Sequence, residues 1–164
     1  MQGQAIPFRL VSRPTFWLAG KKTWIGGPDN AEFGRFWEQC RAEGLFDIFD
    51  RLTQLKPGVV TQGVTLGISR VEQDPSRREF YYMIAVEIEE KDAADGLDTY
   101  QVPATQWAVF ECRGKIPDAI VTAEIFAFTR WLPDSGYTHD LAPEMEVYPP
   151  AVKEDYCEFW LPVI

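Results

Sequence analysis

Two stripes of apolar residues at helical spacing stand out along this chain. The first consists of Phe33, Phe36, Trp37 and Cys40, with charged residues on the opposite side, and predicts a helix capped by Asp29 or Asn30. Gly44 ends this helix, and residues 45–55 continue as a second helical piece. The second stripe, after a capping Asp118, consists of Val121, Ile125, Phe128 and Leu132, and Pro133 ends its helix.

Segments in which apolar and polar residues alternate lie on both sides of each predicted helix. Segments 7–25, 63–71 and 79–89 surround the first helix, and segments 100–113, 144–148 and 156–163 surround the second. Segment 7–25 reads as one extended strand or a bent pair, with Pro14 and Gly20 at a bulge or bend, and Pro103 interrupts the long strand 100–113. Segment 79–89 carries apolar residues on both faces, which predicts a strand covered on both sides. Each half of the chain therefore reads strand, helix, strand, strand.

This repeated order predicts an α+β fold of duplicated βαββ modules, whose antiparallel sheets form a central groove with two main helices packed on them. A length of 164 residues suits a single domain, with pseudo-repeats at about 7–90 and 99–164. The groove between two such modules is the natural place for a ligand.

Charge and aromatic content narrow the functions that this fold could serve. The net charge of −9 disfavours direct binding of nucleic acid and favours cationic ligands or a basic protein partner. Aromatic residues make up 14% of the chain, enough to line a pocket as well as to build a core.

The cysteines and the ends of the chain predict a protein without cofactor or membrane span. Three cysteines without a C-x-x-C spacing and a single histidine make no zinc site, so we expect no metal. The N-terminus lacks the pattern of a signal peptide, and no run approaches the roughly 20 apolar residues that cross a membrane. These features favour a cytoplasmic protein.

The segment Pro143–Tyr148 is the strongest candidate for chemistry. As a strand it places Glu144, Glu146 and Tyr148 on one face, with Met145 and Val147 on the other. Two carboxylates and a phenol on one face form either a solvated sheet surface or a polar site.

Four segments in order resemble the GyrI-like small-molecule-binding domain, the effector-binding domain of many AraC-type and MerR-type bacterial transcription regulators. They are Gln106–Ile116, Trp131–Tyr137, Pro143–Tyr148 and Tyr156–Ile164. The match is specific in the second half, whereas residues 7–90 agree in layout only. This family also includes free-standing proteins, and the chain has no helix-turn-helix region, so we expect a stand-alone member.

The resemblance implies an aromatic-lined pocket between two βαββ modules, in which a buried glutamate meets the charge of a lipophilic cation. The family's pocket glutamate corresponds to Glu146, and a pocket residue of its closing strand corresponds to Trp160. Tyrosines of its central hairpin correspond to Tyr82 or Tyr81.

The pattern of residues adds three further candidates for the ligand site. Tyr148 shares the face of Glu146, and Glu87, on a face with Tyr81, is placed in the pocket or at its rim. Phe126 lies off the main stripe of its helix and could reach the groove.

Four neighbouring residues are expected to lie elsewhere. Glu144, near the end of its strand, and His139, in a polar loop, are expected to be exposed. Trp37 and Trp131 lie on the predicted helices and are expected in the core.

Three functions agree with these features. The first is a binding protein for lipophilic cationic or aromatic compounds, acting as a drug or xenobiotic sensor or a sequestering agent. The second, implied by the resemblance, is a hydrolase of reactive cyclopropane-bearing natural products, in which Glu146 would orient or deprotonate a water. The third is a protein-interaction module of the gyrase-inhibitor type that uses the acidic surface.

Overall fold

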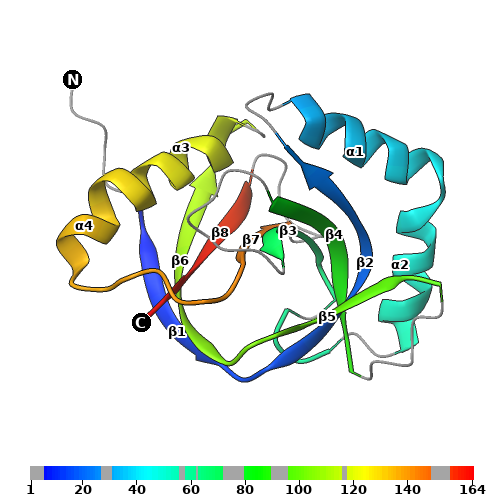
Figure 1. Cartoon of the computed structure of the whole chain (residues 1–164), viewed down its shortest axis with the longest axis horizontal. Helices are drawn as coiled ribbons and strands as arrows, with labels where there is room; N and C mark the ends of the chain where they lie inside the picture. Colours follow the sequence, from blue (N-terminus) through cyan, green and yellow to red (C-terminus); the bar gives the residue numbers. More distant parts are fainter. Residues whose placement is uncertain are drawn as a thin grey trace.

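Eight antiparallel strands form a single sheet in the order β1-β6-β8-β7-β3-β4-β2-β5, with the helices on one face (Figure 1). The computed structural model describes residues 6–26, 31–55, 58–61, 63–71, 80–89, 96–115, 118–148 and 156–164. The strands are β1 (Phe8–Arg13), β2 (Phe16–Ile25), β3 (Thr65–Val71), β4 (Phe80–Ile88), β5 (Asp98–Val102), β6 (Thr105–Arg113), β7 (Glu144–Tyr148) and β8 (Tyr156–Val163). The helices are α1 (Ala31–Ala42), α2 (Leu45–Leu55), α3 (Asp118–Phe126), a π-helical turn (Ala127–Trp131) and α4 (Leu132–Ser135).

The two predicted modules are joined into one continuous sheet, which confirms the α+β class. The first module contributes β3-β4-β2 and the second contributes β7-β8-β6, and β3 pairs with β7 where the modules meet. β1 precedes β2 in the chain but pairs with β6, and β5 precedes β6 but pairs with β2. Segment 7–25, expected as one extended strand or a bent pair, is a pair of strands. Each module's leading strand extends the half of the sheet formed by the other module.

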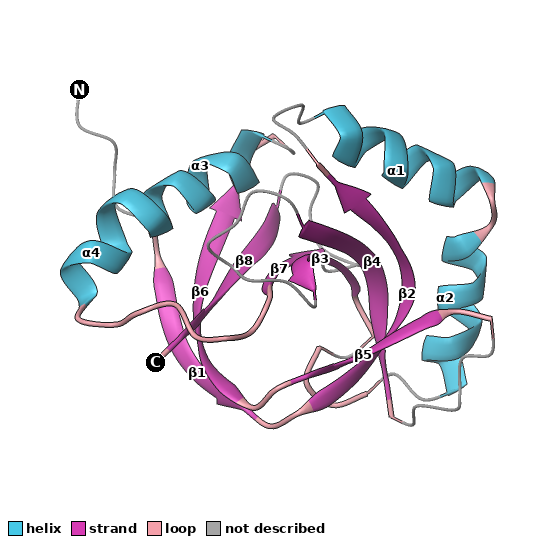
Figure 2. Cartoon of the chain, viewed as in Figure 1, coloured by secondary structure: helices cyan, strands magenta, loops and turns pink. Residues whose placement is uncertain are grey.

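Both faces of the sheet are covered by apolar side chains. On the helix-facing side, α1 and α2 pack on β4 through residues such as Phe36 and Tyr82, and α3 packs on β6 and β8 (Figure 2). The opposite face carries its own cluster, which includes Met83, Trp107 and Trp160. β4 contributes to clusters on both sides, as its sequence pattern predicts.

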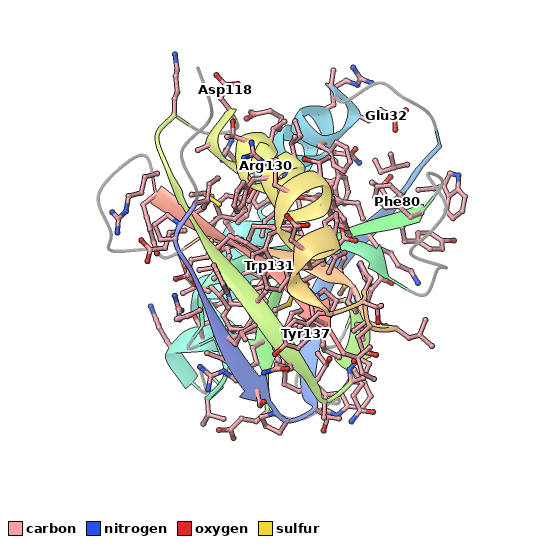
Figure 3. The ribbon with its side chains drawn as sticks, turned by 90° about the vertical axis from the view of Figure 1, so that its left-hand side faces the viewer. Glu32, Phe80, Asp118, Arg130, Trp131 and Tyr137 are labelled. Atoms are coloured by element: carbon pink, nitrogen blue, oxygen red, sulfur yellow. The ribbon has the colours of Figure 1, made fainter. Side chains whose placement is uncertain are left out.

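The helix over 118–135 packs differently from its predicted stripe. Val121 and Ile125 are 43% and 58% exposed, whereas Ile120 and Ala123 face the sheet. The π-helical turn that follows adds a residue to the helical turn, which changes the face that later residues present. Figure 3 shows this helix running from Asp118 past Arg130 and Trp131 towards Tyr137.

Gly20 was expected to mark a bend, but it lies inside the ladder, paired with Ala85 of β4 and Asp98 of β5. A Cβ at this position would lie 1.9 Å from the carbonyl oxygen of Ile84, so the close approach of two backbones requires glycine. The predicted cap at Asp29 or Asn30 lies outside the described residues. Among the helices that the structure describes, none has the length and apolar character needed to cross a membrane.

Candidate functional site

Glu146 lies on the helix-facing side of β7, near the middle of the sheet. Its Oε1 accepts hydrogen bonds from the hydroxyls of Tyr82 on β4 (2.9 Å) and Tyr148 on β7 (2.7 Å). The Tyr82 hydroxyl in turn accepts a hydrogen bond from Nε1 of Trp37 on α1, at 3.0 Å. A hydrogen-bonded chain therefore links the first helix to the carboxylate across the junction of the two modules.

Gly67 on β3, directly opposite Glu146, makes room for this chain. A Cβ at Gly67 would lie 2.4 Å from the Tyr82 hydroxyl and 2.6 Å from Oε1 of Glu146. Such distances are far below van der Waals contact, so only glycine lets the phenol and the carboxylate meet over β3.

Burial is the main cause that raises the pKa of Glu146 above its ordinary value, and the charge of Glu144 adds to it. The hydrogen bonds from Tyr148 and Tyr82 oppose this shift because they stabilise the carboxylate. Burial and the neighbouring carboxylate also raise the pKa of both phenols, which therefore keep their protons and act as donors. Within the described ranges no side chain hydrogen-bonds Oε2 of Glu146, so this oxygen remains an acceptor for a ligand.

A groove of about 530 Å³ lies beside this chain of hydrogen bonds, between the α1–α2 junction and the sheet. It is lined by Trp37, Arg41, Gly44, Phe46, Asp47, Thr65 and Tyr148. The rings of Trp37 and Phe46 are stacked, with centroids 5.8 Å apart and planes at 13°. The edge of Tyr148 meets Trp37 at 5.5 Å, so aromatic faces and edges form much of the wall.

Charged side chains at the rim of the groove leave it acidic. Arg41 is paired with Glu38 (2.6 Å), and its guanidinium lies over the ring of Phe46. Asp47 is exposed at the mouth of the groove. The two charged residues of the lining, Arg41 and Asp47, have opposite signs, and Glu38 beside Arg41 adds a further negative charge.

The structure brings three of the sequence-predicted site residues together: Glu146, Tyr148 and Tyr82. Tyr81 lies on the other face of β4, where its ring meets Trp24 edge-on at 5.0 Å, so Tyr82 is the hairpin tyrosine at the carboxylate. Phe126 packs against Phe110 of β6 (6.2 Å) rather than against the residues around Glu146.

Trp160 lies on the face of the sheet opposite to Glu146. It is 4% exposed, packs against Trp107 at 5.7 Å, and its Nε1 donates to Glu158 at 3.0 Å. Its register opposite Met145 fixes this side, because Met145 and Glu146 point to opposite faces of β7. The structure therefore does not place Trp160 in the groove.

Glu87 also lies on the opposite face and is only 3% exposed. Its carboxylate accepts hydrogen bonds from the backbone N–H groups of Val60 (3.1 Å) and Thr61 (2.7 Å) and from the Thr61 hydroxyl (2.9 Å). This carboxylate anchors the segment 58–61 to β4, a structural role that its place in the sequence does not reveal.

Replacing Glu87 with glutamine is expected to lower the free energy of unfolding by about 1–3 kcal/mol. The carboxamide places an NH₂ group where Oε2 accepts a hydrogen bond from the Val60 N–H at 3.2 Å, and the site is too buried for water to compensate. Urea unfolding followed by circular dichroism measures the change, with Asp50→Asn, which replaces an exposed carboxylate on α2, as control. Equal stability of both variants and wild type would contradict this role.

Two expectations about neighbouring residues are wrong, and two functional residues were missed. Glu144 is buried, at 5% exposure, and Nε2 of His139 contacts its Oε2 at 2.8 Å; His139 is half-buried. Trp37 packs against the core cluster, as expected, and also lines the groove, a role that helical periodicity does not reveal. The second missed residue is Gly67. Its position as an isolated glycine inside a predicted strand was the one signal of a close approach that the sequence offered.

No group of three or more His, Cys, Asp and Glu side chains is arranged to hold a metal ion in the part of the chain that the structure describes. The site therefore consists of a hydrogen-bonded carboxylate, two phenols and an aromatic groove.

Comparison with known proteins adds a family and several structural neighbours. Residues 9–163 match the model of the family Cass2, integron-associated effector binding protein. SAV2435 bound to tetraphenylphosphonium is similar in structure, with a TM-score of 0.78, 22% identity, and coverage of 97% of this chain and 94% of that one. The comparison with curated proteins gave no match.

Two further structures share the fold at lower identity. The C-terminal domain of EcmrR has a TM-score of 0.63 and 15% identity, with coverage of 98% of this chain and 99% of the domain. The integron cassette protein VCH_CASS2 from the mobile metagenome of Vibrio cholerae has a TM-score of 0.60 and 11% identity, with coverage of 96% and 95%.

Proposed function

Because this chain belongs to the Cass2 family of integron-associated effector-binding proteins, we propose that its effector is a lipophilic, aromatic cation held beside Glu146. The family match spans nearly the whole chain and also confirms the resemblance to the GyrI-like effector-binding domain. The proposed role is that of a sensor or sequestering protein for such compounds.

The observation that carries this proposal is the carboxylate of Glu146, which is fixed by two phenols beside an aromatic groove. A carboxylate removed from water costs free energy unless it gains a partner of opposite charge. A bulky cation with a delocalised charge loses little hydration on entry, and contact with the faces of Trp37 and Phe46 contributes about 0.5–2 kcal/mol per ring. For a small hydrated cation, the free energy lost on dehydration would exceed the free energy gained from contacts in the groove.

The ligand of a neighbouring structure has the same chemistry. SAV2435 is seen with tetraphenylphosphonium, a permanent cation surrounded by aromatic rings. The identity of 22% establishes a common fold, and the proposal that this chain takes a similar ligand rests on its own carboxylate and rings.

The affinity for tetraphenylphosphonium is expected to rise with pH as Glu146 loses its proton. Since burial raises the pKa of Glu146, the gain should occur at a higher pH than the ordinary glutamate value of about 4.3. Below that pKa the carboxyl group is neutral, and the affinity should fall by up to about tenfold per pH unit. The ligand carries a fixed charge, so the profile reports the protein alone.

Calorimetric titrations at a series of pH values, within the range where circular dichroism shows the native fold, measure this profile. The Glu146→Gln variant serves as the control and should give an affinity that does not change with pH. A wild-type affinity equally independent of pH would contradict the role of the carboxylate.

The same geometry supports a hydrolase as the second candidate function. Both phenol hydroxyls donate their hydrogen bonds to Oε1 of Glu146. The other oxygen, Oε2, could then orient or deprotonate a water molecule next to an electrophile bound in the groove. Turnover of a cyclopropane-bearing electrophile, followed by mass spectrometry, would distinguish this function from binding alone, because a binding protein leaves the compound intact.

A further inference from the structure

Two of the three cysteines, Cys112 on β6 and Cys157 on β8, face each other directly across the antiparallel pair of strands. They are 1% and 0% exposed and lie in the apolar cluster beneath α3, together with Ile120 and Phe159. The neighbouring Cys157 thiol, followed by burial, raises the pKa of the Cys112 thiol. The sheet register thus holds two thiols side by side.

This thiol pair lies directly behind one wall of the groove. The register pairs Thr65 on β3 with Tyr148 on β7 and Val147 on β7 with Glu158 on β8, so Tyr148 and Cys157 are the next residues beyond that last pair. Thr65 and Tyr148 both line the groove, and Tyr148 also packs against the cluster that contains the cysteines. Tyr148 therefore lies between the groove and the nearer thiol.

We propose that Cys112 and Cys157 form a two-thiol binding site for a soft metalloid of the trivalent arsenic class, entered from the groove past Tyr148. Soft sulfur ligands select soft ions, and two sulfurs on adjacent strands can bind one centre together. The sheet already fixes the backbone of both cysteines, so chelation costs little additional conformational entropy.

The reaction with an organic arsenoxide is balanced without an oxidant. The As=O bond is replaced by two As–S bonds, and the two thiol protons leave with the oxygen as one water molecule. Arsenic remains trivalent throughout. Two neighbouring thiols are required, because a single thiol forms one As–S bond that water readily reverses.

Cys40 provides an internal comparison. It is as buried as the pair, at 1% exposure, but lies in a different cluster, on the buried face of α1 with Phe36. Burial raises its pKa to about 11. That cluster contains no other cysteine among the described residues. Cys40 is therefore as buried as Cys112 and Cys157, but it has no second thiol beside it among the described residues.

The test is treatment of the native protein with an equimolar amount of phenylarsine oxide, followed by intact-mass spectrometry. We expect one phenylarsenic group per chain in wild type and in Cys40→Ala. In Cys112→Ser and in Cys157→Ser, whose fold is checked by circular dichroism, we expect about tenfold less adduct or none. Tyr148→Ala, which opens the wall, should form the adduct about tenfold faster.

A second measurement needs no variant. After arsenical treatment, wild type is unfolded in urea and alkylated with iodoacetamide, and peptide mapping then identifies the protected cysteines. Protection of Cys112 and Cys157 with alkylation of Cys40 supports the site. Adduct formation only after unfolding, or protection of any other set of cysteines, would overturn it. The outcome does not depend on whether the groove binds cations.

Discussion

The Glu146→Gln variant is expected to bind tetraphenylphosphonium about 30-fold to 1,000-fold more weakly than wild type, a loss of about 2–4 kcal/mol. The substitution keeps the size of the side chain and its place between Tyr82 and Tyr148, but removes the charge that meets the cation. Isothermal titration calorimetry at neutral pH measures both affinities directly.

The matched control for this variant is Asp134→Asn in α4, an exposed carboxylate that changes the net charge by the same amount. It should leave the affinity unchanged within about twofold, because exposed charges beyond a Debye length of about 10 Å are screened. Equal losses in the two variants would mean that overall charge attracts the cation, and Glu146 would lose its assigned role.

Replacing Gly67 with alanine is expected to separate Tyr82 from Glu146 and to weaken cation binding by about tenfold or more. The added methyl group would overlap the Tyr82 hydroxyl and Oε1 of Glu146, so at least one of these side chains must move. Overpacking of this kind costs about 1–3 kcal/mol of stability. We therefore expect a folded protein with a lower melting temperature and an impaired site.

Gly34→Ala is the control for Gly67→Ala, because a Cβ at Gly34 in α1 meets no atom within 4 Å. Alanine in the interior of a helix should stabilise it by about 0.5–1 kcal/mol. Thermal unfolding and calorimetric titration of both variants separate stability from binding. Unchanged affinity in Gly67→Ala would show that the contact between the phenol and the carboxylate is dispensable.

The local elements of this fold could be predicted because periodicity is a local property. β7 and β8 begin and end where the alternation of apolar and polar residues begins and ends, at 144–148 and 156–163. The partners of a strand are not local: alternation cannot show that β1 pairs with β6 instead of its neighbour β2. The π-helical turn at Ala127–Trp131 has no signal in a pattern that assumes 3.6 residues per turn.

Only the part of the site that lies on a single strand could be predicted from the sequence. Glu146 and Tyr148 are two residues apart on β7, so their common face follows from alternation alone. The face of Trp160 relative to Glu146 could not be predicted, because it depends on the register of β8 against β7, and a shift of one residue reverses it. Trp37 joins the site only through the packing of α1 on β4, which the sequence does not specify.

The central claim is that the groove recognises a delocalised positive charge, and a paired titration tests it most directly. Wild-type protein is titrated by calorimetry with tetraphenylphosphonium and, separately, with triphenylphosphine oxide, an uncharged compound with similar rings. We predict one saturable site for the cation and an affinity about tenfold or more lower for the neutral compound. Equal affinities, or no binding of the cation, would contradict the claim.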